Sequence, residues 1–116
     1  MLQQPMGSSK NTYGALLNEG SHYKVIPARR EGPGEAEVHA VDTDVFYIIS
    51  GDATFVTGGA VVAPRQTAPE ETRGVSIDGG VPHELHTGDV VVIPNGEPHW
   101  FQRVSPAFKY LVVKAR

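Results

Sequence analysis

Residues 88–99 read GDVVVIPNGEPH. After the opening turn signature, Val90 to Ile93 form a short run of β-branched residues, which predicts a buried strand. Pro94-Asn95-Gly96 predicts a tight turn. His99 then opens another apolar run that reaches Val104 and predicts a second strand. The segment therefore places a histidine at the start of a strand, directly after a turn.

A second segment, remote in sequence, carries further candidate metal ligands. Glu37 and His39 are two residues apart in a predicted strand, so their side chains point to the same face. Asp44 follows after a gap that could be a turn, and it opens another strand rich in β-branched and aromatic residues. If these strands fold over one another, Glu37, His39, Asp44 and His99 offer two imidazoles and two carboxylates. Such a mixed donor set suits one divalent ion of zinc, iron, manganese or nickel.

The segment at residues 88–103 resembles the second motif of the cupin family, which is commonly written G-x5-P-x-G-x2-H-x3-N. Gly88, Pro94, Gly96 and His99 match the motif with its full spacing. Arg103 stands where the family has Asn. The resemblance implies that His99 is a metal ligand.

The other segment is similar to the first cupin motif, G-x5-H-x-H-x3,4-E-x6-G, with departures. His39 falls on the second His, Asp44 takes the Glu position, and Gly51 takes the final Gly position. Glu37 occupies the place of the first His, and Glu31 stands where the first Gly belongs. By this resemblance Glu37, His39 and Asp44 join His99 as metal ligands, although cupins that lose ligands can lack an ion.

The strand pattern and the resemblance predict an all-β fold. About ten short strands, 13 Gly and 9 Pro, and no convincing long helix favour a double-stranded β-helix, a jelly-roll barrel of two facing antiparallel sheets. We expect residues 1–20 to form an N-terminal arm and residues 21–116 a single cupin barrel domain. Residues 28–34 predict a surface loop. Residues 64–73 are polar and predict a long connection that is functional or contacts another subunit.

Strand phase also predicts the residues around the ion. Phe46, Ile48 and Phe101 share the phase of the ligands and could line a substrate pocket. Arg103 shares the phase of His99 and could pair with an anionic substrate from the cavity wall, or be a solvated arginine near a strand end. The remaining histidines have no motif support, which favours surface or packing positions: His22, His83 and His86.

Composition excludes several classes of function. The chain has no Cys, which rules out thiolate metal sites, disulfides and Cys nucleophiles. A formal net charge of -3 with no basic block argues against nucleic acid or anionic membrane as a partner. No apolar stretch is long enough to span a bilayer, and the first 20 residues lack the apolar core of a signal peptide, so a cytoplasmic location is the default expectation.

Three functions remain open. The chain could be a metal-dependent enzyme, such as a dioxygenase or isomerase, acting on a small organic molecule in the barrel. It could be a non-catalytic module that binds a small ligand, or a scaffold that uses residues 64–73 and the N-terminal arm for contacts. The resemblance also implies a homodimer, because cupins of this size commonly pair through their sheets.

Overall fold

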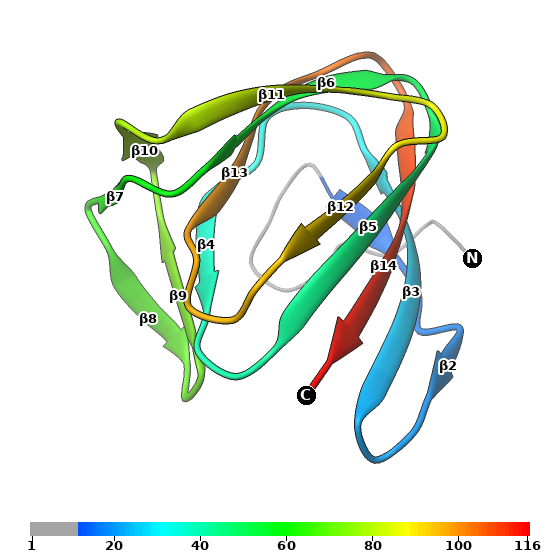
Figure 1. The fold of residues 1–116 in the computed structure, drawn as a ribbon, viewed down its shortest axis with the longest axis horizontal. Helices are drawn as coiled ribbons and strands as arrows, with labels where there is room; N and C mark the ends of the chain where they lie inside the picture. Colours follow the sequence, from blue (N-terminus) through cyan, green and yellow to red (C-terminus); the bar gives the residue numbers. More distant parts are fainter. Residues whose placement is uncertain (1–11) are drawn as a thin grey trace.

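The computed structural model describes residues 12–116. The regular secondary structure in that range consists of β-strands, without a helix. Residues 1–11, part of the predicted N-terminal arm, lie outside the described residues. Two antiparallel sheets face each other and form a barrel (Figure 1), which confirms the predicted all-β jelly roll. The strands are β1 (Thr12–Gly14), β2 (Asn18–Glu19), β3 (Tyr23–Arg30), β4 (Ala36–His39), β5 (Thr43–Ser50), β6 (Asp52–Thr57), β7 (Ala60–Val62), β8 (Arg65–Ala68), β9 (Glu71–Gly74), β10 (Ser76–Asp78), β11 (Val81–His86), β12 (Val90–Ile93), β13 (His99–Val104) and β14 (Phe108–Ala115).

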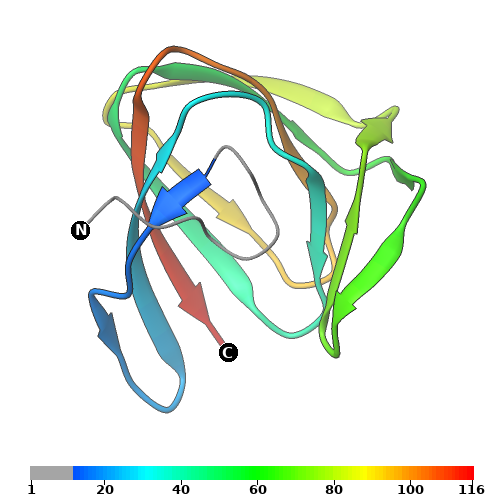
Figure 2. The same ribbon diagram turned by 180° about the vertical axis from the view of Figure 1, so that it is seen from behind.

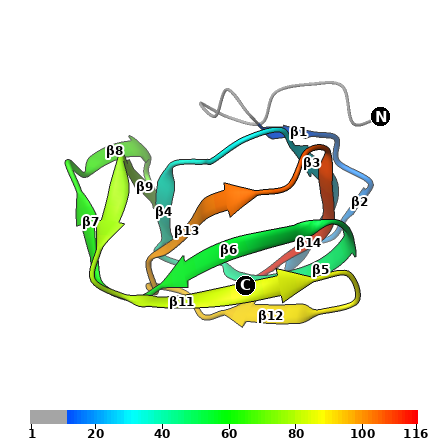
Figure 3. The ribbon, with the colours of Figure 1, turned by 90° about the horizontal axis from the view of Figure 1, so that it is seen from above.

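The strands are distributed over two large sheets and one small one. The first sheet has the order β1-β3-β14-β5-β12, with β2 also paired to β3, and the second has the order β11-β6-β13-β4-β9-β8. Strands β7 and β10 pair with each other. Figure 3 shows the layer of β6 and β11 over the layer of β5 and β12. Seen from behind in Figure 2, the green strands β7 to β9 form one flank of the barrel.

The apolar core fills the barrel between the two large sheets. Alternate residues of β5 face inward, so Phe46 and Ile48 are buried while Tyr47 and Ile49 are exposed. The ring centroids of Phe46 and Phe101 are 5.6 Å apart, and those of Phe55 and Phe101 are 4.7 Å apart. Such aromatic pairs add about 0.5–1.5 kcal/mol each beyond the area they bury.

The inward row becomes polar where β5 begins and β14 ends. Asp44 precedes Phe46 in the inward phase of β5 and is 1% exposed. It is the register partner of Lys114 on β14. The buried charge of Asp44 therefore lies directly beside the aromatic core at this end of the barrel.

Two predicted loops are partly strands in the structure. Residues 28–34 were expected to form a surface loop, and residues 31–34 lie outside any strand, but β3 continues to Arg30 and pairs with β14. Both Ala28 and Arg30 are buried. Residues 64–73 contain β8 and most of β9, which pair with each other, and β9 also pairs with β4. The polar composition misled the prediction because these short strands are held by backbone pairing to neighbours that are remote in sequence.

Residues 12–19, the described part of the predicted arm, contain two short strands. Strands β1 and β2 both pair with β3, so this segment adds to the first sheet. Residues 12–116 contain no helix with the length and apolar character that a bilayer crossing requires.

Candidate metal centre

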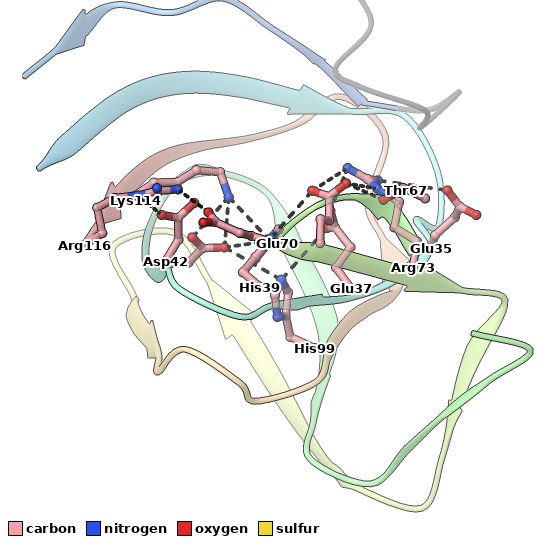
Figure 4. Close-up of polar contacts among 12 residues, drawn as sticks. Glu35, Glu37, His39, Asp42, Thr67, Glu70, Arg73, His99, Lys114 and Arg116 are labelled. Carbon is pink, nitrogen blue, oxygen red and sulfur yellow. Dashed lines mark hydrogen bonds and ion pairs between the residues drawn. The ribbon is translucent and has the colours of Figure 1, made fainter. Parts of the chain in front are cut away.

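The four predicted ligands come together at the polar end of the barrel. Glu37 and His39 lie on β4, His99 opens β13 and pairs in register with Glu37, and Asp44 lies near the start of β5. The short turn between β4 and β5 returns the chain so that Asp44 faces His39. Figure 4 shows Glu37, His39 and His99 side by side.

The donor atoms have spacings that one metal ion could close. Ligand atoms of Glu37, His39 and His99 all lie within 4.8 Å of one another. The Asp44 carboxylate is 3.3 Å from Nε2 of His39 and 3.8 Å from Nε2 of His99. When donors are arranged tetrahedrally around an ion with bonds of about 2.0–2.2 Å, the distance between two donor atoms is roughly 3.3–3.6 Å. Small side-chain movements would therefore bring these donors to bonding distance.

His99 presents a free ring nitrogen to the cluster. Its Nδ1 is 3.3 Å from the carbonyl oxygen of Glu97, which can only accept, so Nδ1 carries the proton and Nε2 holds the lone pair. His99 is 2% exposed, and its Nε2 has no hydrogen-bond partner among residues 12–116. Metal-bound histidines characteristically donate their other N–H to a carbonyl or carboxylate. This buried, unpaired nitrogen therefore fits a metal ligand.

Two cationic side chains hold the carboxylates of the cluster. Nη2 of Arg73 is 3.0 Å from Oε1 of Glu37, while Oε2 of Glu37 faces His99. Nζ of Lys114 lies 3.1 Å from the Asp44 carboxylate and 3.5 Å from Nε2 of His39. Arg73 thus leaves one Glu37 oxygen available to an ion. Lys114, in contrast, contacts both the Asp44 carboxylate and Nε2 of His39, so it competes with an ion for these two groups.

Glu71 completes the cluster from the hairpin of β8 and β9. Its carboxylate lies 3.6 Å from Nδ1 of His39 and 3.0 Å from Nε of Arg73. This places a carboxylate behind His39 on the ring side opposite the cluster, where it can steady the ring and favour a proton on Nδ1.

Burial and the neighbouring charges shift the pKa values of the cluster. Burial by itself would raise the pKa of Glu37, but His99 and Arg73, with smaller contributions from His39 and Arg30, lower it to about 2. Burial lowers the pKa of His39, helped by Lys114, and burial also lowers the pKa of His99. The cluster therefore offers neutral imidazoles and an ionised Glu37 at neutral pH, the protonation states that metal ligands require.

A small cavity of about 70 Å³ opens beside the cluster. Of the predicted pocket residues, only Phe46 lines it, whereas Ile48 and Phe101 are buried in the aromatic core. Arg103 lies outside the barrel, half exposed, with its Nη2 2.9 Å from Asp52. The residues that line the cavity are Arg30, Glu37, His39, Asp44, Phe46, Glu71, Arg73, Tyr110, Val112 and Lys114.

Of the two alternatives for Arg103, the structure agrees with the solvated arginine, and its place in the predicted substrate pocket has to be corrected. The pairing of β13 with β6 shifts register between Phe101 and Arg103, which leaves Gln102 as an extra residue. A bulge of this kind breaks the two-residue alternation of a strand. Arg103 consequently turns to solvent, whereas His99 and Phe101, before the shift, face inward.

Comparison with known proteins identifies the fold. No family model matches the sequence, and no curated protein matches it. Among solved structures, a protein proposed to be a mannose-6-phosphate isomerase from Ralstonia eutropha has a TM-score of 0.65 and 15% identity, covering 97% of this chain and 91% of its own. KdgF from Halomonas sp. has a TM-score of 0.64 and 10% identity, covering 95% and 84%.

A sugar phosphate isomerase from the cupin superfamily of Silicibacter pomeroyi has a TM-score of 0.61 and 17% identity. The match covers 91% of this chain and 60% of that protein. The chain has the cupin fold. The glycines of the two motif segments take turn conformations in this cupin barrel, since Gly51, Gly88 and Gly96 have φ values of 100°, 93° and 84°.

Several residues of this cupin barrel's cavity were missed by sequence reasoning. Lys114 shares the phase of Tyr110 and Val112, so strand alternation along β14 could have predicted that it faces inward. Glu71 and Arg73 gave no comparable signal, because only the pairing of β9 with β4 brings them to the cluster.

The shifted pKa values predict that the metal-free protein loses stability in acid. His39 and His99 have pKa values below 6.5 in the folded state, so below about pH 6.5 the unfolded chain binds more protons and unfolding is favoured. The slope reaches at most about 2.7 kcal/mol per pH unit for two histidines. Glu37 extends the loss from pH 4.5 down to about 2. Asp44 acts in the opposite direction, because burial raises its pKa.

Urea unfolding of EDTA-treated protein at pH 7.5, 6.0 and 5.0 measures this dependence. We expect the free energy of unfolding to fall at each step. An unchanged free energy between pH 7.5 and 5.0 would show that the two histidines are not held neutral by the fold.

Proposed function

We propose that this cupin barrel binds one divalent metal ion through Glu37, His39 and His99 and acts on a small organic molecule in the adjacent cavity. The observation that carries the proposal is the buried Nε2 of His99, which has no hydrogen-bond partner among residues 12–116. Two imidazoles and one carboxylate are borderline donors that suit zinc, iron, manganese or nickel.

We propose Asp44 as a fourth ligand that becomes available only when Lys114 moves away. Its carboxylate is close enough to His39 and His99 to share an ion, but Lys114 holds it at 3.1 Å. The geometry therefore supports a three-ligand site with room for substrate. A bound divalent ion would supply Lewis-acid polarisation of a substrate oxygen.

The chain's own residues would position and protect such a reaction. Arg73 orients Glu37, Glu71 stands behind His39, and the aromatic core closes the inner end of the cavity. Preorganised groups of this kind hold a reacting molecule without further rearrangement. Of the three similar structures, one is described as a sugar phosphate isomerase and another is proposed to be a mannose-6-phosphate isomerase. These two descriptions support a small polar substrate.

A metal titration tests the first part of the proposal. Zn²⁺, Mn²⁺, Fe²⁺ and Ni²⁺ are added separately to EDTA-treated protein, and binding is followed by isothermal calorimetry together with elemental analysis after dialysis. We expect one equivalent of at least one of these ions to be retained, with protons released on binding at pH 6. Retention of none of the four would refute the metal site.

A non-catalytic function with the same site is the second candidate. The cavity of about 70 Å³ is small for an enzyme pocket, since drug-sized ligand sites span roughly 300–1,000 Å³. Metal binding without turnover of any small polar substrate would favour a ligand-binding module. The hairpin of β8 and β9 supplies Glu71 and Arg73 to the cavity, which favours a role in the site, and the scaffold hypothesis stays a prediction. A cytoplasmic location stays a prediction.

We also propose a homodimer that forms through the outer face of the first sheet. Val90 and Val92 of the edge strand β12 are 60% and 59% exposed, and Tyr47 and Ile49 of the neighbouring β5 are 46% and 44% exposed. Apolar groups gathered on an exposed sheet edge favour association. Sedimentation at micromolar concentration should show a dimer, and Val92→Lys should shift it to monomer. A monomeric wild type would refute the proposal.

A further inference from the structure

Arg30 carries a buried charge beside the proposed metal site. It lies at the end of β3 in the inward phase of Ala28 and is 4% exposed. Its guanidinium carbon is 4.7 Å from the ring centroid of Phe101, and its Nη2 donates to the Tyr110 hydroxyl at 3.3 Å. Arg30 and Tyr110 both line the cavity beside the metal cluster.

Among residues 12–116, most of the hydrogen-bond donors of Arg30 have no acceptor. A guanidinium has five N–H donors, and Nε and Nη1 of Arg30 have no hydrogen-bond partner among residues 12–116. The other two cations of the cavity differ, because Arg73 pairs with Glu37 and Glu71 and Lys114 pairs with Asp44. In the described part of the chain Arg30 forms no ion pair. A buried charge without a partner is costly, so the site favours an anion that enters from outside.

The charge balance of the cavity points the same way. Its three carboxylates, from Glu37, Asp44 and Glu71, are matched by three cations, from Arg30, Arg73 and Lys114. A divalent ion on neutral histidines would therefore leave the cavity with an excess of about two positive charges. A single carboxylate ligand would reduce this excess by one charge and would accept hydrogen bonds from Arg30.

We propose that Arg30 and the Tyr110 hydroxyl form a carboxylate-binding subsite, and that the ligand of this protein is a small organic acid. This inference deepens the proposed function, on which it rests for the neighbouring metal. The cavity has room for roughly five water-sized groups, which suits a carboxylate with a short substituent that reaches toward Glu37 and the two histidines. A planar guanidinium binds a carboxylate through two parallel N–H···O bonds. The small cavity of about 70 Å³ favours the planar carboxylate over the bulkier tetrahedral phosphate.

The neighbourhood of Gly34 offers a way to displace the Arg30 head without removing its charge. A Cβ on Gly34 would lie 2.0 Å from Nη1 of Arg30, so Gly34→Ala must push the flexible end of that side chain aside. The Gly34 backbone itself is anchored, because its carbonyl accepts from Nε1 of Trp100 and its N–H donates to the carbonyl of Phe101. The variant should therefore fold with Arg30 shifted.

The test uses glycolate, its neutral isostere glycolamide, and inorganic phosphate as probes. Each is titrated into the EDTA-treated full chain, and binding is followed by two-dimensional NMR that includes the arginine Nε–H signals. Arg30→Met removes the charge and keeps the length of the side chain. Arg103→Met is the matched control, because Arg103 is an exposed arginine outside the barrel. Gly34→Ala replaces Arg30→Met if the latter does not fold.

We expect glycolate to bind wild type and Arg103→Met within twofold of each other, and to bind Arg30→Met and Gly34→Ala at least tenfold more weakly. Equal affinity for wild type and Arg30→Met would overturn the subsite, as would glycolamide binding as tightly as glycolate. Phosphate binding tenfold more tightly than glycolate would overturn the carboxylate assignment.

The failures of the two proposals are distinguishable. Zinc retention by wild type with no effect of Arg30→Met on glycolate affinity would overturn the subsite and leave the metal site standing. Loss of the metal site in wild type would not alter the glycolate titration, because that titration is carried out in metal-free protein.

Discussion

Replacing His99 by Gln is expected to weaken zinc binding by more than about 100-fold. His99 supplies the one buried ring nitrogen that has no hydrogen-bond partner among residues 12–116, and glutamine fills a similar volume without an imidazole lone pair. Loss of a group that merely supports a metal-bound histidine already costs 10–100-fold in affinity, so loss of a ligand should cost more. Calorimetric titration of Zn²⁺ into EDTA-treated protein measures the change.

His86→Gln is the matched control for this experiment, because the His86 side chain is 70% exposed on β11 and far from the cluster in the sheet order. It should bind zinc as wild type does. Retention of one zinc by His99→Gln, with an affinity within threefold of wild type, would rule out His99 as a ligand. Thermal melting of both variants without metal verifies that each is folded.

Replacing Lys114 by Met should have opposite effects on stability and on metal affinity. In the metal-free protein Lys114 is the cation that pairs with Asp44, which is almost fully buried. Removing one partner of a buried pair costs about 3–5 kcal/mol, and we expect about 2–3 kcal/mol because the Lys114 side chain is one-fifth exposed and Asp44 can take up a proton. Urea unfolding in EDTA measures this loss.

The same substitution should tighten zinc binding. It removes a positive charge 3.5 Å from Nε2 of His39 and releases Asp44 as a fourth donor. Zinc should therefore restore more stability to Lys114→Met than it adds to wild type. Lys109→Met, at an exposed position of the same strand, should change stability by no more than about 0.5 kcal/mol. Weaker zinc binding by Lys114→Met would show that Lys114 supports the site instead of competing for it.

The metal cluster could be predicted from the sequence because its signal is local. Strand alternation puts Glu37 and His39 on one face, and the spacing from Gly88 to His99 places that histidine directly after a turn. The structure brings Glu37 and His39 together with His99, and Asp44 lies beside them. Whether these residues hold a metal stays a prediction that the titrations decide.

Arg103 and Arg30 show why the arginine of the cavity could not be predicted in the same way. The bulge at Gln102 reverses the phase of β13, so that Arg103 points outward. Arg30 stands in a run of charged residues, Gly and Pro that is typical of a loop, yet pairing with β14 extends β3 as far as Arg30 and turns this residue inward. The types of the residues do not reliably predict where a bulge occurs or where a strand ends.

The sequence by itself determined the all-β barrel and the residues that can serve as metal ligands, because alternation along a strand and glycines at turns act over a few neighbouring positions. Only the tertiary structure decided which cations reach those ligands. Arg73, Lys114 and Arg30 come from three different strands, and their places depend on how β9, β14 and β3 pair across the barrel. Strand pairing between segments that are remote in sequence brings these cations to the cavity, where we propose that they determine which ligand binds. No local sequence pattern predicts that arrangement.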